Sequence, residues 1–231
     1  MGDRGGGAPV PAGRTLRHFV GDAVWRDLLG QVFERPHPAG SMLLRQGEPG
    51  THVLAVLSGV AKVLRRERNG DLTLLAFRGP GELLGEVAVL DDDVRSASVE
   101  TISSCTVGVI GKAEFLRFVV DHDLFPVLVR YAFTRMRESD EARGGGGGTL
   151  TRLAATLVGL ADIAGQPAGR PGEPLELALT RNELAQYLGI SRNTISATLA
   201  ELESCDVEAG RKRIVLGDLP ALRRVSGAPG S

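Results

Sequence analysis

LTRNELAQYLGISRNTIS, residues 179–196, is the stretch of sequence that decides the fold of the C-terminal part. Thr180 and Glu183 have the T-x-x-E spacing of a capping box, which predicts that a helix begins beside them. Ser191 can cap a second helix, and Gly189 lies between the two, where a sharp turn favours glycine. Two capped helices joined by a glycine turn are the pattern of a helix-turn-helix.

The second helix is expected over residues 191–203, with Ile195, Leu199 and Leu202 as its buried positions. Ala185 in the first helix is small enough to let the two helices cross closely. The segment EAGRKRIVLGD, residues 208–218, predicts a β-hairpin wing with a basic tip.

Positive charge in this part of the chain is local. Residues 149–231 contain equal numbers of basic and acidic residues, so the overall positive charge common in DNA-binding domains is missing. Basic residues nevertheless occur at Arg181, at Arg192 and at the tip Arg211-Lys212-Arg213. A capped three-helix bundle without a DNA-binding role is the alternative, and the placement of these basic residues favours DNA binding.

From about Leu43 to Ile110 the sequence alternates short apolar runs with Gly, Pro, Asn and Asp. Runs such as HVLAVLSGVAKVLRR, LTLLAF and CTVGVI predict strands of an all-β roll or barrel. Asn69-Gly70 between two such runs predicts a hairpin turn, because both residues tolerate positive φ.

After Lys112 the pattern becomes helical. Residues 113–122 predict a short helix, and residues 125–143 a longer one whose apolar stripe includes Leu128 and Tyr131. We expect a partner helix to cover that stripe. The run Gly144–Gly148 should stop the helix, because glycine costs up to about 1 kcal/mol per helical position relative to alanine. A further helix is expected over residues 149–165, before a Gly/Pro-rich linker.

The segment GEVAVLDDDVRSASV, residues 85–99, places a Gly-Glu pair ten residues ahead of an Arg-Ser pair. Three consecutive aspartates lie between the two pairs. One interpretation is a hairpin with a solvated acidic tip that pairs with Arg95. The other is a small anion pocket.

Bulk composition excludes several classes of protein. The 231 residues carry a net charge of −1, which gives no global sign of a nucleic-acid or membrane partner. Two distant cysteines argue against a disulfide framework and against an iron–sulfur or zinc site, and they fit a reducing cytoplasm. No apolar run is long enough to span a bilayer, and the Gly/Pro-rich N-terminus lacks the apolar core of a secretory signal. No GxSxG, HExxH or P-loop motif occurs, so we expect neither an enzyme nor a metal site.

Taken together, LLRQGEPG, VLSGVAKV, GELLGEVAVL, RSASV and LTRNELAQYLGISRNTIS resemble, in the right order, segments of the catabolite activator protein/fumarate–nitrate regulator (Crp/Fnr) family of bacterial transcription factors. The resemblance covers nearly the whole chain after residue 20. It implies an α+β fold with an N-terminal cyclic-nucleotide-binding β-roll, a long dimerisation helix and a C-terminal winged helix-turn-helix. The expected boundaries are a disordered tail at 1–19, the roll at 20–122, the helix at 123–143, a glycine hinge at 144–148 and the DNA-binding domain at 149–231.

The resemblance also implies roles for individual residues. The effector would be cyclic AMP or cyclic GMP, with no other cofactor: Gly85 and the amides that follow it would meet the cyclic phosphate, Glu86 the ribose 2′-hydroxyl, and Arg95 with Ser96 the phosphate. The residues expected to bind the ligand are Gly85, Glu86, Val87, Ala88, Arg95 and Ser96. The residues expected to contact DNA are Thr180, Arg181, Ser191, Arg192, Asn193, Thr194, Ser196, Arg211 and Lys212. The implied partners are palindromic double-stranded DNA, a second copy of the chain and RNA polymerase, with no membrane.

The end of the long helix departs from the family pattern. It offers Arg137, Glu138, Ala142 and Arg143, with no clear counterpart to the hydroxyl residues of a well-known adenine site. A degenerate pocket with ligand-independent DNA binding therefore stays open as an alternative. So do a cyclic-nucleotide module whose C-terminal domain binds protein, and an enzyme with an unrecognised site.

Overall fold

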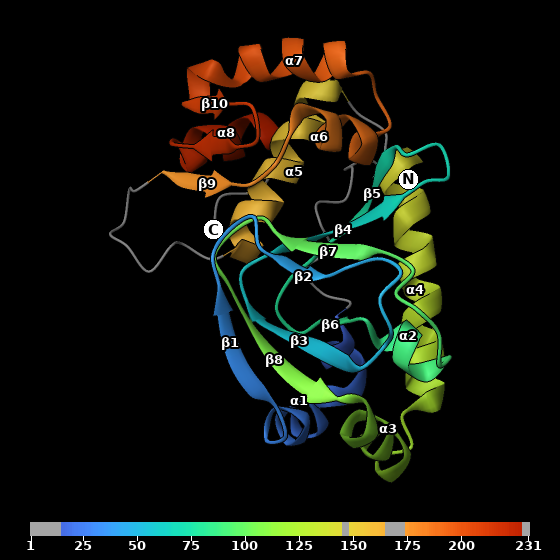
Figure 1. Ribbon diagram of the computed structural model, residues 1–231. Coiled ribbons are helices and arrows are strands. Elements are labelled where there is room, and N and C mark those ends of the chain that lie inside the picture. Colours follow the sequence, from blue (N-terminus) through green and yellow to red (C-terminus); the bar gives the residue numbers. More distant parts are fainter. Residues whose placement is uncertain (1–14, 145–147, 165–173, 228–231) are drawn as a thin grey trace, which may run out of the picture. The chain divides into compact units, whose positions relative to one another are not determined.

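A computed structural model describes residues 15–144, 148–164 and 174–227 (Figure 1). The chain divides into two compact units, Gly13–Arg137 and Glu138–Ser231, which are treated separately below. The fold is α+β, with a β-roll in the first unit and a helix-turn-helix in the second.

Two antiparallel four-stranded sheets form the roll of the first unit, in the orders β1-β8-β3-β6 and β2-β7-β4-β5. The strands are β1 (Phe33–His37), β2 (Met42–Leu44), β3 (His52–Ser58), β4 (Ala61–Arg66), β5 (Leu72–Arg78), β6 (Leu83–Leu84), β7 (Ser98–Thr101) and β8 (Cys105–Gly111). A short helix α2 (Glu86–Leu90) follows β6. The predicted hairpin between β4 and β5 is confirmed, and Gly70 at its turn has φ 89°.

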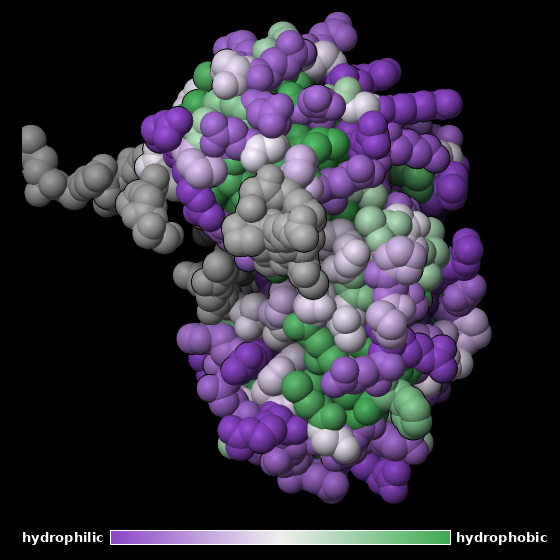
Figure 2. All heavy atoms as spheres, turned by 90° about the vertical axis from the view of Figure 1, so that its left-hand side faces the viewer, coloured by the Kyte–Doolittle hydropathy of each residue, from purple (hydrophilic) through white to green (hydrophobic). Residues whose placement is uncertain are grey.

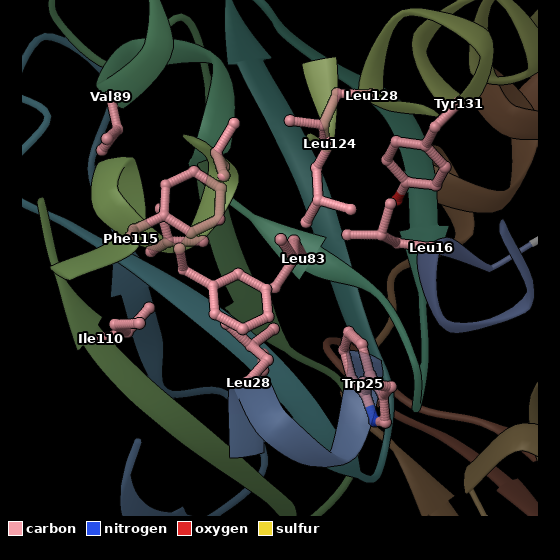
Figure 3. Packing of buried hydrophobic residues seen from close by; sticks show 14 residues of the cluster. Leu16, Trp25, Leu28, Leu83, Val89, Ile110, Phe115, Leu124, Leu128 and Tyr131 are labelled. Carbon is pink, nitrogen blue, oxygen red and sulfur yellow. The ribbon is translucent and has the colours of Figure 1, made fainter. Parts of the chain in front are cut away.

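The strands enclose one buried apolar cluster of their own, and three helices build a second cluster with them: α1 (Leu16–Leu29), α3 (Lys112–Asp121) and α4 (Phe125–Gly144). Trp25 and Leu28 of α1 lie in one cluster with Phe115 of α3 and with Leu128 and Tyr131 of α4 (Figure 3). This cluster attaches the first half of α4 to the roll of its own chain.

The same packing corrects a prediction about α4. Leu128 and Tyr131 are 7 % and 3 % exposed and pack inside their own unit, so they are not the stripe that a partner helix covers. Among the described side chains of α4, the exposed large apolar ones are Phe125, Val129 and Phe133, four residues apart along another face. The helical spacing of Leu128 and Tyr131 does not reveal that α1 covers this face, where Phe19 of α1 packs edge-on against the Tyr131 ring.

The N-terminal boundary also needs correction. Thr15 caps α1 and Leu16 is 2 % exposed, so residues 15–19 belong to the folded unit rather than to a disordered tail. Residues 1–14 lie outside the described part. The strand β1 begins ten residues before the β region expected from the sequence.

Helix α4 is described as far as Gly144, and α5 (Thr149–Ala164) begins beyond the glycine run. That the run stops the helix stays a prediction. Residues 145–147 of the proposed hinge and residues 165–173 of the Gly/Pro-rich linker are outside the described part. The division between the two units falls between Arg137 and Glu138, earlier than the glycine boundary expected from the sequence.

The second unit contains the expected helix-turn-helix, α6 (Arg181–Leu188) and α7 (Arg192–Glu201). The capping box at Thr180 is present, Gly189 has φ 66°, and Ile195, Leu199 and Leu202 are buried. The second helix is shorter than expected, because a 3-10 turn, η1 (Leu202–Cys205), follows it. The wing is β10 (Val207–Ala209) and β11 (Ile214–Leu216), to which the sheet adds β9 (Leu175–Leu177) in the order β10-β11-β9, and α8 (Leu219–Ser226) packs on α5.

Hydrophilic residues cover most of the face shown in Figure 2, and hydrophobic residues show through in smaller groups. Among the described helices, none combines the length and the apolar character needed to cross a membrane.

Candidate ligand pocket and DNA-binding surface

The backbone around Arg95 is held by the loop of residues 47–50. The N–H of Arg95 donates to the carbonyl of Glu48 at 2.8 Å, and the N–H of Gly47 donates to the carbonyl of Arg95 at 2.9 Å. Gly50 packs so tightly on α2 that a Cβ there would lie 2.2 Å from the carbonyl oxygen of Ala88. The QGEPG and RSASV segments, far apart in sequence, therefore form one rigid surface.

The Arg95 side chain turns inward and only 3 % of the residue is exposed. Its Nη1 donates to the carbonyl of Gly85 and its Nη2 to the carbonyl of His52. A Cβ on Gly85 would lie 2.3 Å from Nη1, so glycine is needed to leave room for the guanidinium. Burial lowers the pKa of Arg95, and the carboxylates of Glu86 and Glu48 offset part of that effect. Within the described part of the chain, the hydrogen bonds of this buried guanidinium go to two neutral backbone carbonyls.

The remaining residues expected to bind the ligand follow Gly85 or Arg95 directly. Glu86 opens α2, and burial raises the pKa of its carboxyl, while its own backbone N–H and the charge of Arg78 lower it. Val87 is exposed and Ala88 is buried against the loop described above. Ser96 is exposed beside Arg95. The structure thus gathers the Gly-Glu and Arg-Ser pairs at one place.

The three aspartates between these pairs lie on the surface. Asp92 forms an ion pair with Lys112 at the start of α3, which lowers the pKa of its carboxyl. The interpretation in which the acidic tip pairs with Arg95 is therefore wrong, because Arg95 faces carbonyls instead. No group of three or more His, Cys, Asp and Glu side chains could hold a metal ion in the ranges that the structure describes.

The first turn of α7 presents the expected base-reading residues to solvent: Arg192, Asn193, Thr194 and Ser196 are all exposed. The hydroxyl of Ser191 accepts a hydrogen bond from the Thr194 N–H at 3.1 Å and caps this helix.

Arg181 differs from the expectation of a direct DNA contact. Its Nη2 donates to the carbonyl of Ala209 and its Nη1 to that of Gly210 at 3.3 Å, so its guanidinium ties α6 to the wing. The neighbouring Thr180 hydroxyl accepts from the Glu183 N–H at 3.1 Å and serves as a cap. At the wing tip, Arg211 and Lys212 are exposed.

One buried polar cluster beside Glu86 was not foreseen. Glu82 is 4 % exposed, and its carboxylate accepts from the Tyr131 hydroxyl and from Nη2 of Arg135 on α4. In the sequence, the Gly81-Glu82 pair indicates only a turn. Its partners lie about fifty positions away on α4, so no local spacing could reveal them.

Two models of known protein families match separate parts of the chain. Residues 34–122 match a cyclic nucleotide-binding domain, and residues 151–225 match a Crp-like helix-turn-helix domain. A "Cyclic AMP receptor protein" of Thermus thermophilus is 30% identical over 191 residues, which cover 76% of this chain and 80% of the relative. A "CRP-like cAMP-activated global transcriptional regulator" of Mycobacterium tuberculosis is 28% identical over 169 residues, which cover 71% and 74% of the two chains. Among solved structures, a CRP-family transcriptional regulator of T. thermophilus superposes with a TM-score of 0.60 at 22% identity, covering 84% of this chain and 97% of the other.

Proposed function

The chain belongs to the CRP family of transcriptional regulators, and from this premise we propose that a cyclic nucleotide bound in its β-roll controls the affinity of its helix-turn-helix for DNA. Relatives from M. tuberculosis and T. thermophilus carry names that refer to cyclic AMP, which makes cyclic AMP the first effector to test and cyclic GMP the second.

The observation that carries the ligand half of the proposal is the buried, carbonyl-bound guanidinium of Arg95. A buried cation is costly unless a negative charge compensates it. A guanidinium carries five N–H donors, of which the two carbonyls take one from each terminal nitrogen, and its planar shape suits the paired oxygens of a phosphate. Gly85 fixes the place of this group because a side chain there would displace it.

Glu86 and Ser96 complete the proposed phosphate–ribose site. An ionised Glu86 accepts hydrogen bonds only, which suits a ribose hydroxyl, and the exposed hydroxyl of Ser96 can donate to a phosphate oxygen. The amides of Val87 and Ala88 would line the same side of the ligand.

For DNA, we propose that α7 enters the major groove, with Arg192, Asn193, Thr194 and Ser196 nearest the bases and with Arg211 and Lys212 on the backbone. Ser191 and Thr180, which cap their helices, would meet phosphates at the helix ends.

We further propose that two copies pair along α4, because Phe125, Val129 and Phe133 leave a row of exposed apolar side chains on one face. A symmetric pair would place two recognition helices on a palindrome. RNA polymerase is the implied partner at a promoter, and transcription in vitro would reveal the sign of regulation.

Calorimetric titration with cyclic AMP and cyclic GMP, followed by DNA-binding assays with and without ligand, tests the proposal. Arg95→Ala should abolish nucleotide binding while circular dichroism stays unchanged, because the phosphate loses its counter-charge. Arg68→Ala, at an exposed arginine of the β4–β5 hairpin, is the matched control and should bind as the unaltered chain does. Unchanged affinity of Arg95→Ala would refute the pocket.

A second candidate is ligand-independent DNA binding through a degenerate pocket. The bonds from Arg95 to the carbonyls of Gly85 and His52 favour it, since they already satisfy part of the guanidinium. Equal DNA affinity with and without either nucleotide would support this alternative.

A further inference from the structure

A buried charged cluster joins the ligand-binding end of the roll to α4. Glu82, in the turn before β6, binds Tyr131 through one carboxylate oxygen and Arg135 through the other. The guanidinium carbon of Arg135 also lies 4.7 Å from the centroid of the Tyr131 ring. The side chains of the Glu82–Arg135 pair are 5 % and 12 % exposed, so solvent screens their charges little.

Glu86 lies in the electric field of this cluster. Burial raises the pKa of the Glu86 carboxyl most, the charge of Glu82 raises it further, and the charges of Arg78 and Arg135 lower it. Two carboxylates and two guanidinium groups therefore share one partly buried region, and Arg135 is bonded to Glu82.

The other elements packed near this region contribute little further charge. Helix α1 reaches the turn through its backbone, where the Arg17 N–H donates to the Gly81 carbonyl at 2.9 Å. The Arg17 guanidinium itself pairs with Asp22 at the surface. On the described part of α4, Tyr131 is the titratable group bonded to Glu82, and burial holds its pKa well above the ordinary range, so it stays a neutral donor. The Arg130 guanidinium of α4 lies over the Phe19 ring of α1, 5.7 Å from its centroid.

We propose that Glu82 is a positioning residue for ligand binding: by holding Arg135, it leaves the Glu86 carboxylate open to a hydroxyl of the bound nucleotide. This role rests on the function proposed above, in which Glu86 contacts the ribose. A guanidinium that paired with Glu86 would occupy the oxygens that the hydroxyl needs. Glu82 keeps Arg135 in its pair with Tyr131 and away from Glu86.

The first test removes the charge of Glu82. In Glu82→Gln the Arg135 charge loses the carboxylate of Glu82, and Glu86 is a carboxylate already in its field. We expect the affinity for cyclic AMP to fall by about tenfold or more. In the double variant Glu82→Gln/Arg135→Met no cation is released, and the affinity should return to within about threefold of the original. A double variant that binds as weakly as the single variant, or more weakly, would overturn the role.

The second test needs no ligand. Carboxyl carbon-13 NMR follows the titration of Glu86, assigned by the signal that disappears in Glu86→Gln. Glu82→Gln removes a like charge near Glu86 and releases Arg135, and both changes favour the ionised form of the Glu86 carboxyl. The pKa of Glu86 should therefore fall in this variant. The nucleotide affinity, which rises as Glu86 ionises, should then begin to rise at a lower pH. Glu100→Gln, which breaks the pair with buried Lys62 in the same roll, is the control and should leave the Glu86 titration unchanged.

The outcomes separate the two proposals. Nucleotide binding by the unaltered chain together with an unchanged Glu86 titration in Glu82→Gln would overturn the role of Glu82 and leave the proposed function intact. No nucleotide binding by the unaltered chain would overturn the proposed function and the role of Glu82 with it.

Discussion

Arg181 and Arg192 are the same residue type eleven positions apart, and their surroundings give them different tasks. Arg192 is exposed on the first turn of α7 with its guanidinium directed to solvent. Arg181 is half-buried and binds two carbonyls of the wing. Because the Arg181 guanidinium already holds the protein's own backbone, we expect it to affect DNA binding through the wing that it positions.

We therefore predict that substitutions of Arg192 and Arg181 change DNA affinity and thermal stability in different ways. Arg192→Ala should weaken binding to the specific sequence by about 1–3 kcal/mol, with little effect on random DNA, because a good base contact has that worth. Arg181→Ala should lower the melting temperature and weaken both kinds of DNA by similar factors. Fluorescence anisotropy on specific and random duplexes, with thermal unfolding alongside, measures both effects. Equal losses on the two duplexes in Arg192→Ala would make that residue a phosphate anchor instead.

Single residues of the ligand pocket were foreseen only in part. Gly85, Glu86 and Arg95 were named from a resemblance in sequence. In the structure the Arg95 guanidinium donates to the carbonyl of Gly85, the residue before Glu86, and their role in ligand binding stays a prediction. The carbonyl of His52 that holds Arg95 comes from β3, more than forty positions away, and Glu82 finds its partners on α4. A sequence pattern reveals contacts at short, regular spacing, and these contacts depend on how distant segments pack.

At the scale of elements, the helix-turn-helix was the most predictable part because its signals are local. A cap at Thr180, a left-handed glycine at Gly189 and a cap at Ser191 each act within a few residues. Strand β1 was missed because FERPH contains a proline and two charged residues, shows no alternation and lies at the edge of its sheet. Helix α1 was missed because its apolar face is weak and Gly21 interrupts it with φ 81°.

The turn between α6 and α7 gives a prediction at this scale. Gly189 has φ 66° and ψ 33°, which a residue with a Cβ adopts at a cost of about 1–2 kcal/mol. Gly189→Ala should lower the melting temperature of the chain and weaken DNA binding, while nucleotide binding stays unchanged. Gly189→Asn is the matched control, because asparagine tolerates this conformation better and should lose less. Equal melting temperatures for the alanine variant and the unaltered chain would show that the turn relaxes without strain.

At the scale of the whole molecule, α4 has two apolar faces, one buried and one exposed. Leu128 and Tyr131 pack against the roll, whereas Phe125, Val129 and Phe133 are 51%, 53% and 57% exposed. A row at this spacing is the pattern of a helix–helix interface, and exposed phenylalanines in water are otherwise unfavourable.

We predict that Phe133→Glu produces a monomer, because a charge would be buried within the proposed interface. Sedimentation velocity should show the smaller species, affinity for a palindrome should fall towards that for one half-site, and nucleotide binding should persist. Val120→Glu on α3 changes an equally exposed valine away from the row and should remain a dimer. If the unaltered chain sediments as a monomer at micromolar concentration, pairing along α4 is wrong.

Under the proposed function, the connection between α4 and α5 carries the ligand signal to the DNA-binding domain. Helix α4 is described as far as Gly144 and α5 begins at Thr149, and the run Gly144–Gly148 joins them in the sequence. Each glycine costs a helix about 1 kcal/mol relative to alanine. Replacing all five with alanine should therefore favour one continuous helix and change the ratio of DNA affinities measured with and without cyclic AMP. The ratio of cyclic AMP affinities measured with and without DNA should change by the same factor, because linkage makes the effect of the ligand on DNA binding equal to the effect of DNA on ligand binding.

The control replaces the five glycines with an alternating Gly/Ser run. This variant keeps the length and the flexibility of the segment, and its DNA binding should respond to cyclic AMP as that of the unaltered chain does. An alanine variant with the unaltered ratio would make the run a tolerated spacer rather than a hinge.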